Sequence, residues 1–356
     1  MSSRTHPPAA RARRPSIGFF APSGYLPDPA LMDRAALYLT GAGWRVSAGE
    51  SVFAREQRFA GPDELRAGEL QRFATDATLD VAIAARGGYG LSRLLDRFDY
   101  EAIAAAGKPL VGYSDFTAFN LALLARAGGI SFQGPAASDF ANAGATVDAR
   151  VDDACHPRAA GAADTADGVE EAEAAAAFTM SHFFGALAQA VHTVEFDASH
   201  DAVCAAVSPA VSAPDVALDV RGRLWGGNLS MMCSLLGTPY FPHVRGGILF
   251  LEDVNEPVYR IERMLLQLLH AGVLARQKAI VMGEFSMVPA LSNDNGFCLD
   301  AALVALRARC AVPIVRGLPF GHGRRRVTLP VGAPGRLTVA GTRARLQFHG
   351  HPLVRA

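Results

Sequence analysis

The sequence predicts an α/β protein with two domains or one large domain, and three observations support this fold class. The chain has 356 residues, which is long enough for an ample core. Half of its residues are hydrophobic and 19% are charged, a composition typical of a globular protein. Short apolar runs alternate with helical patterns in the N-terminal part, which indicates a parallel sheet covered by helices on both faces.

In the N-terminal part, apolar runs of strand length end at turns and lead into helical patterns. Asp63 and Glu64 lie at the start of one such pattern, where acidic side chains stabilise the positive end of a helix dipole. The expected strands are residues 16–21, 44–48, 81–85 and 110–111, and the expected helices are 29–42, 62–76, 91–98 and 116–127. Strands separated by helices of this length imply a parallel sheet with helices on both faces.

The middle of the chain breaks this alternation. Residues 141–177 are rich in Ala, Asp, Glu and Gly, and we interpret them as an insertion that is partly a mobile loop. A polar-to-Ala helix is expected from about Glu170, and an ordered helix is expected over residues 179–187. Residues 191–214 look strand-like and contain prolines, so we expect the chain to cross between domains here.

The C-terminal part returns to alternating patterns after the glycine-rich segment 222–230. The expected strands are 247–251, 279–283 and 313–316, the expected helices are 229–236, 258–271 and 299–310, and the tail 327–348 reads as β-structure. The expected organisation is a flexible tail (1–15), an N-terminal domain (16–190), a linker (191–215) and a C-terminal domain (216–356). We detect no internal repeat.

The charge and cysteine content exclude several classes of protein. Lys plus Arg and Asp plus Glu each total 34, so no net field attracts nucleic acid or anionic lipid. No apolar stretch is long enough to span a bilayer, and none near the N-terminus has signal-peptide length, so a cytoplasmic protein is expected. The five cysteines include no Cys-x-x-Cys pair, and we expect reduced cysteines that pack mostly as small apolar groups.

Ser114 is the candidate nucleophile. The segment KPLVGYSD (108–115) runs from a strand directly into a helix, which exposes a side chain at the carboxyl end of the sheet, where α/β folds bind ligands. This is the geometry of a nucleophile elbow, although the Gly-x-Ser-x-Gly pattern is absent. Local sequence also fits a simpler alternative, in which Ser114 only caps the helix.

The glycine-rich turn 86–90 (RGGYG) also lies at a strand end. Adjacent glycines allow close approach to a substrate, so the backbone N–H groups of Gly88 and Asp115 form a candidate oxyanion hole. A phosphate loop or a plain tight turn is the alternative, but no Gly-Lys-Ser/Thr of a P-loop follows.

A serine nucleophile needs a base and an acid that orients it. His322 lies in a glycine-flanked turn after a strand, and Glu252 closes the apolar strand that precedes it at 248–251. A solvated strand-end carboxylate is the alternative for Glu252. Arg324, in the run 324–326, and Arg86 are candidates for holding a substrate carboxylate, and no metal-binding cluster or cofactor motif is evident.

Together these pieces resemble the LD-carboxypeptidase family of serine peptidases, the muramoyltetrapeptide carboxypeptidases. The matching segments occur in one order through most of the chain: RGGYGLSRLL (86–95), VGYSDFTA (111–118), SFQGP (131–135), WGGNL (225–229), LFLEDVNE (249–256) and GLPFGH (317–322) with LPVG (329–332). The resemblance implies a Ser-His-Glu triad of Ser114, His322 and Glu252, with the serine on the first domain and the other two on the second. It implies no metal and no cofactor.

The resemblance also implies a fold and a function. The N-terminal domain should resemble class I glutamine amidotransferases, the C-terminal α/β domain should be smaller, and the protein should be a homodimer. The implied reaction releases D-Ala from murein tetrapeptide during cell-wall recycling. Two alternatives are an immunity peptidase that cleaves a peptidyl-nucleotide antibiotic of the microcin C type, and a non-catalytic protein that binds murein peptides. The insertion at 141–177 looks longer than the family needs.

Overall fold

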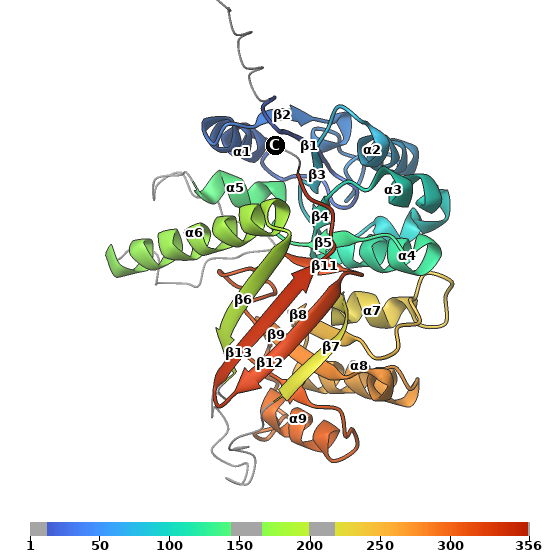
Figure 1. Cartoon of the computed structure of the whole chain (residues 1–356), viewed down its shortest axis with the longest axis vertical. Helices are drawn as coiled ribbons and strands as arrows, with labels where there is room; N and C mark the ends of the chain where they lie inside the picture. Colours follow the sequence, from blue (N-terminus) through green and yellow to red (C-terminus); the bar gives the residue numbers. More distant parts are fainter. Residues whose placement is uncertain (1–12, 144–165, 199–217, 355–356) are drawn as a thin grey trace, which may run out of the picture.

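The computed structural model describes residues 13–143, 166–198 and 218–354, and its strands form two sheets (Figure 1). The first sheet has the order β11-β5-β4-β3-β1-β2, and the second has the order β10-β9-β8-β7-β12-β13-β6. The expected α/β architecture, with a parallel N-terminal sheet and a second C-terminal sheet, is confirmed.

The strands of the first sheet are parallel except at one edge, where a C-terminal strand joins it. The parallel strands are β1 (Ser16–Phe20), β2 (Arg45–Ala48), β3 (Val81–Ala84), β4 (Leu110–Gly112) and β5 (Ser131–Gln133). The edge strand β11 (Leu329–Val331) pairs antiparallel with β5, so the two ends of the chain share this sheet.

Both faces of the first sheet are covered by helices. These are α1 (Ala30–Gly41), α2 (Asp63–Thr75), α3 (Tyr100–Ala106), α4 (Thr117–Ala127), α5 (Ala137–Ala143) and α6 (Ala166–Ala188). The alternation of β1 explains this layering, because Ile17 and Phe19 enter a core shared with α1, α5 and α6, whereas Phe20 enters the core on the side of α2 and α4. Figure 1 shows the two groups of helices on opposite sides of the sheet.

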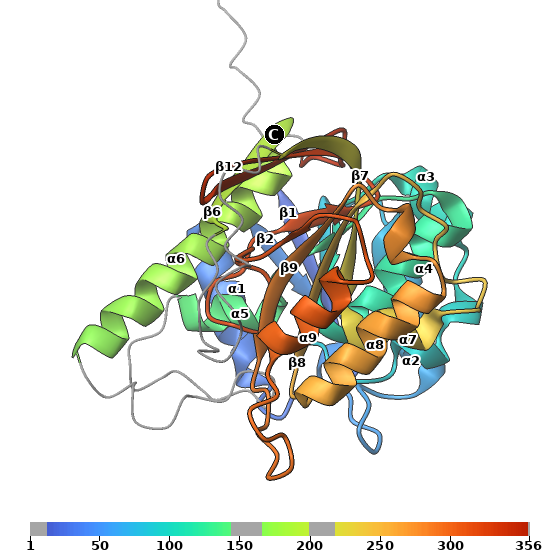
Figure 2. The same cartoon turned by 90° about the horizontal axis from the view of Figure 1, so that it is seen from below.

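The second sheet is half parallel and half antiparallel. Its parallel strands are β7 (Leu218–Asn228), β8 (Ile248–Val254), β9 (Ala279–Ser286) and β10 (Ile314–Val315), and its antiparallel strands are β12 (Pro334–Ala340), β13 (Arg343–His349) and β6 (Val191–Asp197). The helices α7 (Leu229–Leu235), α8 (Val258–His270) and α9 (Leu299–Arg307) lie beside the parallel strands (Figure 2).

The structure differs from the sequence-based expectations mainly in the middle of the chain. Of the predicted insertion, residues 144–165 lie outside the described residues, and α6 is one continuous helix rather than two. The predicted linker begins with β6, the edge strand of the second sheet, and its residues 199–215 are not among those described. The predicted helix 91–98 is a pair of 3₁₀ turns, η2 (Leu91–Arg93) and η3 (Leu95–Arg97).

The cysteines follow the expectation only in part. Cys233 and Cys310 are buried free thiols, and burial raises the pKa of Cys233 to about 12. Cys298, however, is disulfide-bonded, which corrects the expectation of reduced cysteines at this position.

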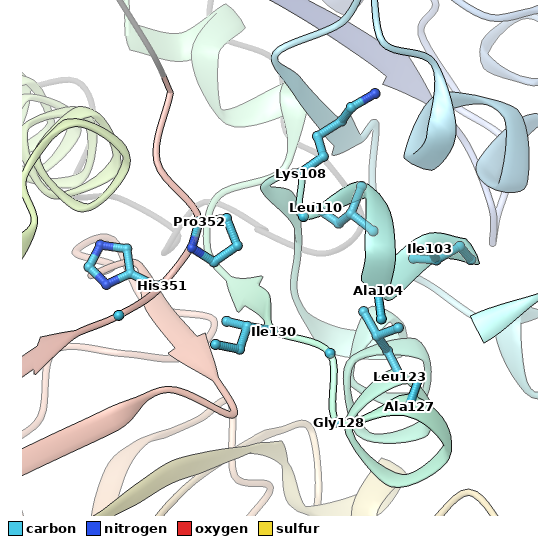
Figure 3. A pocket seen from close by; sticks show the side chains of 13 residues that line it. Ile103, Ala104, Lys108, Leu110, Leu123, Ala127, Gly128, Ile130, His351 and Pro352 are labelled. Atoms are coloured by element: carbon cyan, nitrogen blue, oxygen red, sulfur yellow. The ribbon is translucent and has the colours of Figure 1, made fainter. Parts of the chain in front are cut away.

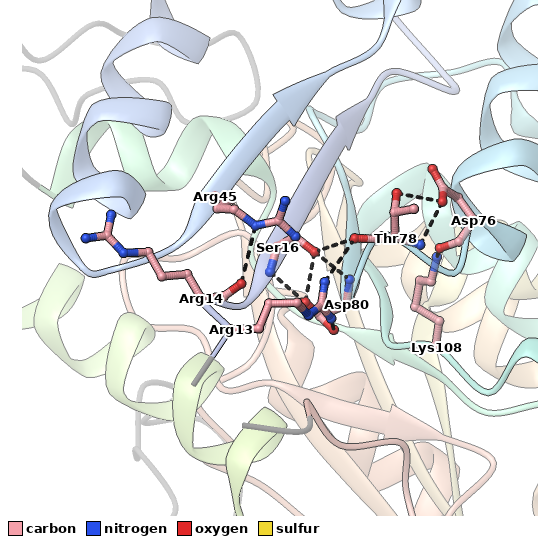
Figure 4. Close-up of polar contacts among 8 residues, drawn as sticks. All are labelled: Arg13, Arg14, Ser16, Arg45, Asp76, Thr78, Asp80 and Lys108. Carbon is pink, nitrogen blue, oxygen red and sulfur yellow. Dashed lines mark hydrogen bonds and ion pairs between the residues drawn. The ribbon is translucent and has the colours of Figure 1, made fainter. Parts of the chain in front are cut away.

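The start of the described chain is tied to the first sheet rather than loose. Arg13 pairs with the carboxylate of Asp80, and the same carboxylate accepts a hydrogen bond from the Ser16 amide at 2.7 Å. The Ser16 hydroxyl donates to the Thr78 carbonyl at 2.8 Å (Figure 4). These contacts anchor the amino end of β1, whereas the predicted tail up to residue 12 lies outside the described residues.

A pocket of about 410 Å³ opens near the amino ends of β4 and β5, between α3, α4 and the C-terminal segment (Figure 3). Lys108, which lines it, donates to the carbonyl of Phe73 at 2.7 Å. Since Ser114 follows the carboxyl end of β4, this pocket and the candidate nucleophile lie at opposite ends of the parallel strands. No helix among the described residues is long and apolar enough to cross a membrane.

A partly buried histidine pair joins α6 to β6. The rings of His182 and His192 are hydrogen-bonded, with Nδ1 and Nε2 3.0 Å apart, and Nδ1 of His192 lies 2.9 Å from the Gln189 side-chain oxygen. Burial, with the nearby His182 and His351, lowers the pKa of His192 from 6.5 to about 4. The pair is therefore held neutral, with His182 as donor and His192 as acceptor.

This pair makes stability depend on pH. Because the folded-state pKa of His192 lies below its usual value, the unfolded chain binds more protons between about pH 6.5 and pH 4. The free energy of unfolding should fall by roughly 2–3 kcal/mol on acidification through this window. Denaturant titrations at several pH values measure the slope. His192→Gln should reduce it, and the exposed His243→Gln should not; equal slopes in all three proteins would contradict the prediction.

Candidate active site

Ser114 sits in a sharp turn between β4 and α4. Its φ is 61°, in the left-handed region that non-glycine residues avoid. It starts a single 3₁₀ turn, η4 (Ser114–Phe116), and α4 begins immediately afterwards. Such strain, between a strand and a helix, is a feature of nucleophile elbows.

The alternative in which Ser114 only caps the helix does not fit this geometry. Phe116 occupies the N-cap position of α4 and Tyr113 that of η4, and no side-chain hydrogen bond caps either of these elements. The position of Ser114 is therefore not explained by a capping role.

The glycine-rich turn after β3 packs directly against this serine. A Cβ atom placed on Gly87 would lie 2.8 Å from Cβ and 3.1 Å from Oγ of Ser114, so only glycine fits here without moving the serine. The next residue, Gly88, has φ of 109° and lies against Gly24 from the turn after β1. The glycine-rich turn after β3 thus lies between the Ser114 turn and the turn after β1.

A methyl group at position 87 should disable the site without unfolding the protein. In Gly87→Ala the new Cβ would push Ser114 off its position, and a displacement of about 1 Å at a reacting group costs about 10²-fold in rate. The measurement is kcat of the variant and of the wild-type protein with the same substrate. Gly24→Ala is the matched control, since its Cβ meets nothing closer than 3.5 Å. Equal kcat values for Gly87→Ala and wild type would contradict the steric argument.

The side chain of Asp115 fastens these turns together, a role that sequence reasoning missed by considering only its backbone N–H. Its Oδ2 accepts hydrogen bonds from the Ser23 hydroxyl at 2.7 Å and from the Leu91 amide at 2.9 Å. Burial raises the pKa of this carboxyl group, and the hydrogen bonds from Ser23 and Leu91 oppose the rise. Asp115 therefore links the turn after β1, the glycine-rich turn and the Ser114 turn.

His322 and Glu252 come together at the carboxyl ends of the parallel strands of the second sheet. Nδ1 of His322 lies 2.7 Å from Oε2 of Glu252, and their side chains are 2% and 0% exposed. Glu252 is the third residue from the end of β8, and His322 lies in the loop that follows β10. With Nδ1 held by a carboxylate, the imidazole presents Nε2 as a base.

A second carboxylate, Glu284 at the end of β9, lies beside this pair. Its side chain occupies the space that a Cβ on Gly323 would fill, so Gly323 lets the loop close over it. Burial raises the pKa of the Glu284 carboxyl group, and the negative charge of Glu252 adds to this rise. The charges of Arg326 and His322 act in the opposite direction and lower it. Sequence reasoning passed over Glu284, although it follows the predicted strand 279–283 in the same way that Glu252 follows the apolar run 248–251.

The two halves of the site meet through buried contacts. The rings of Tyr113 and His322 lie 5.0 Å apart, which brings the residue before Ser114 against the imidazole. Behind them, the Thr117 hydroxyl accepts hydrogen bonds from the Gln133 side chain at 2.8 Å and from the Asn228 amide at 3.1 Å. The start of α4 is thus fixed against the end of β7.

The two candidate substrate-binding arginines lie on different parts of this region. Arg86 donates to the Tyr25 carbonyl at 2.9 Å, within the turns around Ser114. Arg324 is half-exposed and pairs with Glu171 of α6 at 3.1 Å. Within the described ranges, no group of three His, Cys, Asp or Glu side chains is arranged to hold a metal ion.

The sequence matches two family models in the same order as the two sheets. Residues 17–134 match the LD-carboxypeptidase N-terminal domain, and residues 221–337 match the LD-carboxypeptidase C-terminal domain. A probable murein peptide carboxypeptidase of Bacillus subtilis is 28% identical over 338 residues, which cover 95% of this chain and 93% of that protein. A putative carboxypeptidase of Streptomyces coelicolor is 31% identical over 337 residues, covering 93% of this chain and 92% of the relative.

Solved structures agree with these matches. The crystal structure of muramoyltetrapeptide carboxypeptidase from Oxalobacter formigenes superposes with a TM-score of 0.77 and 38% identity, covering 95% of this chain and 99% of that one. The microcin C7 self-immunity protein MccF has the same fold, with a TM-score of 0.73 at 22% identity over 96% of this chain and 97% of that one. The predicted resemblance is confirmed: the chain belongs to the LD-carboxypeptidase family, and it is a serine-type carboxypeptidase.

Proposed function

We propose that this protein hydrolyses the bond between the L-centre of a diamino acid and the terminal D-Ala of murein tetrapeptide, in cell-wall recycling. The observation that carries the proposal is the His322–Glu252 pair, with its 2.7 Å hydrogen bond, held against the strained Ser114 turn through Tyr113. The names of the Bacillus and Oxalobacter proteins support the same substrate.

In the proposed mechanism, Ser114 Oγ attacks the scissile carbonyl carbon while His322 Nε2 takes the hydroxyl proton. Glu252 keeps the other ring nitrogen protonated and stabilises the imidazolium. The N–H groups of Gly88 and Asp115 stabilise the oxyanion. The intermediate collapses as the C–N bond breaks and His322 gives its proton to the departing D-Ala amine. A water molecule then hydrolyses the acyl-enzyme by the same proton transfers.

A carboxypeptidase must also recognise the free carboxylate at the end of its substrate. Arginine suits this task, because its planar guanidinium forms paired hydrogen bonds with a carboxylate. We assign this role to Arg86, whose guanidinium lies in the turns around Ser114, and a second substrate contact to Arg324, whose half-exposed pair with Glu171 is easily exchanged for a substrate carboxylate.

The direct test is to incubate the protein with murein tetrapeptide and measure free D-Ala. Release of D-Ala with formation of tripeptide supports the proposal, and the absence of both rejects it. Labelling with a fluorophosphonate separates the alternative of a non-catalytic binding protein, which should bind tetrapeptide without turnover and leave Ser114 unlabelled.

A second candidate substrate is a peptidyl-nucleotide antibiotic of the microcin C type. The observation that favours it is Tyr89, which is 44% exposed in the glycine-rich turn, where an aromatic ring could stack on an adenine. Parallel assays with tetrapeptide and with a peptidyl-adenylate rank the two substrates by kcat/KM.

Several further expectations belong to the same proposal. We infer two domains, 16–190 and 216–356, with the serine on the first. We also infer that the first domain resembles class I glutamine amidotransferases. A homodimer is expected as well, and light scattering tests it. We also propose a cytoplasmic location without nucleic-acid or membrane partners. The disulfide at Cys298 argues against that location, since disulfides are rare in the cytosol, and cell fractionation decides the question.

A further inference from the structure

Arg326 is a buried cation that the proposed mechanism does not use. It is 2% exposed, although it is the last of three consecutive arginines. Its Nε donates to the Gly321 carbonyl at 2.7 Å, its Nη1 pairs with Asp139 at 2.7 Å, and its amide donates to the Thr179 hydroxyl at 3.0 Å. Its guanidinium lies over the Tyr113 ring, 3.9 Å from the centroid. A guanidinium is costly to bury unless hydrogen bonds and opposite charges compensate it.

The contacts of Arg326 join the two halves of the candidate site. Tyr113 immediately precedes Ser114, and Gly321 immediately precedes His322. One guanidinium therefore touches the residue before the nucleophile and the residue before the base. Since the Tyr113 and His322 rings are also 5.0 Å apart, movement of Arg326 would change the position of the imidazole relative to the serine.

Arg326 also balances the negative charge around His322. Four groups interact electrostatically with the Arg326 guanidinium: Asp139 on α5, Glu252 on β8, Glu284 on β9 and Tyr113, which follows β4. Without this cation, the carboxylates of Glu252 and Glu284 would act on His322 unopposed and favour its protonated form. A protonated imidazole cannot accept the proton of Ser114.

We propose that Arg326 is a positioning residue, which holds the Tyr113–Ser114 turn against the Gly321–His322 loop and supplies the charge that keeps His322 available as a base. This inference rests on the proposed function, because it assigns Arg326 a task in that reaction. Because Arg326 is buried and its guanidinium contacts Gly321, Asp139 and Tyr113, we expect its replacement to change kcat rather than KM.

The test compares Arg326→Met with Arg326→Lys in the full-length protein, using D-Ala release from murein tetrapeptide between pH 5 and pH 9. Arg326→Met should lower kcat by about 10²-fold, leave KM within about threefold, and move the acid limb of the kcat/KM profile to higher pH by about one unit. Arg326→Lys keeps the charge but loses the planar fork, so kcat should fall while the acid limb stays in place. The matched control is Arg336→Met, which removes a half-exposed arginine paired with Asp219 and should change neither quantity.

The outcomes separate this inference from the proposed function. A folded Arg326→Met variant with wild-type kcat and an unmoved acid limb overturns it. If that variant does not fold, Arg326→Lys decides, and an unchanged kcat there is equally fatal. If wild type releases no D-Ala, the proposed function fails, and the rate of fluorophosphonate labelling of Ser114 replaces kcat. Labelling at equal rates and with equal pH dependence in wild type and variants then overturns the role of Arg326.

Discussion

Replacing Ser114 with alanine is expected to abolish D-Ala release while leaving the fold intact. The loss should be about 10⁴-fold or more in kcat, the order found when the serine of a serine–histidine–acid triad is removed. The reason is that His322, held by Glu252, then has no hydroxyl proton to take, although the proposed oxyanion donors remain. The measurement is D-Ala release from murein tetrapeptide, with circular dichroism to confirm folding.

The backbone at Ser114 adds a second readout to this experiment. Because φ is 61° there, a Ser114→Gly variant should relieve strain and raise the free energy of unfolding by about 1 kcal/mol, although it is equally inactive. The control is Ser234→Ala, because Ser234 is an exposed serine of α7 whose hydroxyl donates to the Met231 carbonyl of its own helix. Full turnover by Ser114→Ala would end the serine-peptidase interpretation, and a destabilised glycine variant would remove the argument from strain.

Much of the fold could be predicted from the sequence because periodicity and turn residues are local signals. The strands around Ile17, Ile83 and Leu249 are short, mainly apolar runs, and each forms a buried parallel strand. The residues that follow the three runs are Pro22, Arg86 and Glu252. The pairing of β11 with β5 was not predictable in this way, since it joins residues about two hundred positions apart and depends on tertiary packing.

The candidate site shows the same division. Ser114 and Glu252 were found because each follows an apolar strand, and such strand ends gather at one edge of a sheet. Arg326 was not singled out, because the arginine run 324–326 was considered only as a candidate for holding a substrate carboxylate, which requires an accessible guanidinium. Only the folded chain buries the third of them, between Asp139 and Tyr113, and leaves the other two exposed. Burial of a charge is set by its neighbours in space, which local sequence does not reveal.

The acid of the proposed triad offers the second large effect, since a Glu252→Gln variant should lose about 10⁴-fold in kcat. The carboxylate of Glu252, 2.7 Å from His322 Nδ1, allows only the tautomer with a proton on that nitrogen, so that Nε2 is the acceptor. An amide can donate as well as accept, which permits the opposite tautomer and leaves Nε2 protonated. The imidazolium formed during attack also loses its counter-charge. The measurement is kcat for D-Ala release at pH 7 to 8.

The neighbouring carboxylate provides a matched control for Glu252, because both are buried and adjacent on β8. Asp253 accepts hydrogen bonds from the Asn228 side chain at 3.0 Å and from the Ser230 hydroxyl at 2.7 Å, and burial raises its pKa to about 6. It serves α7 rather than His322, so Asp253→Asn should lower thermal stability and leave kcat within about threefold of wild type. If the two variants lose kcat to the same extent, then the loss reflects disturbance of the strand, and Glu252 has no separate role in orienting the base. If only Glu252→Gln is inactive, then the two adjacent buried carboxylates have different roles, because Glu252 contacts His322 whereas Asp253 contacts Asn228.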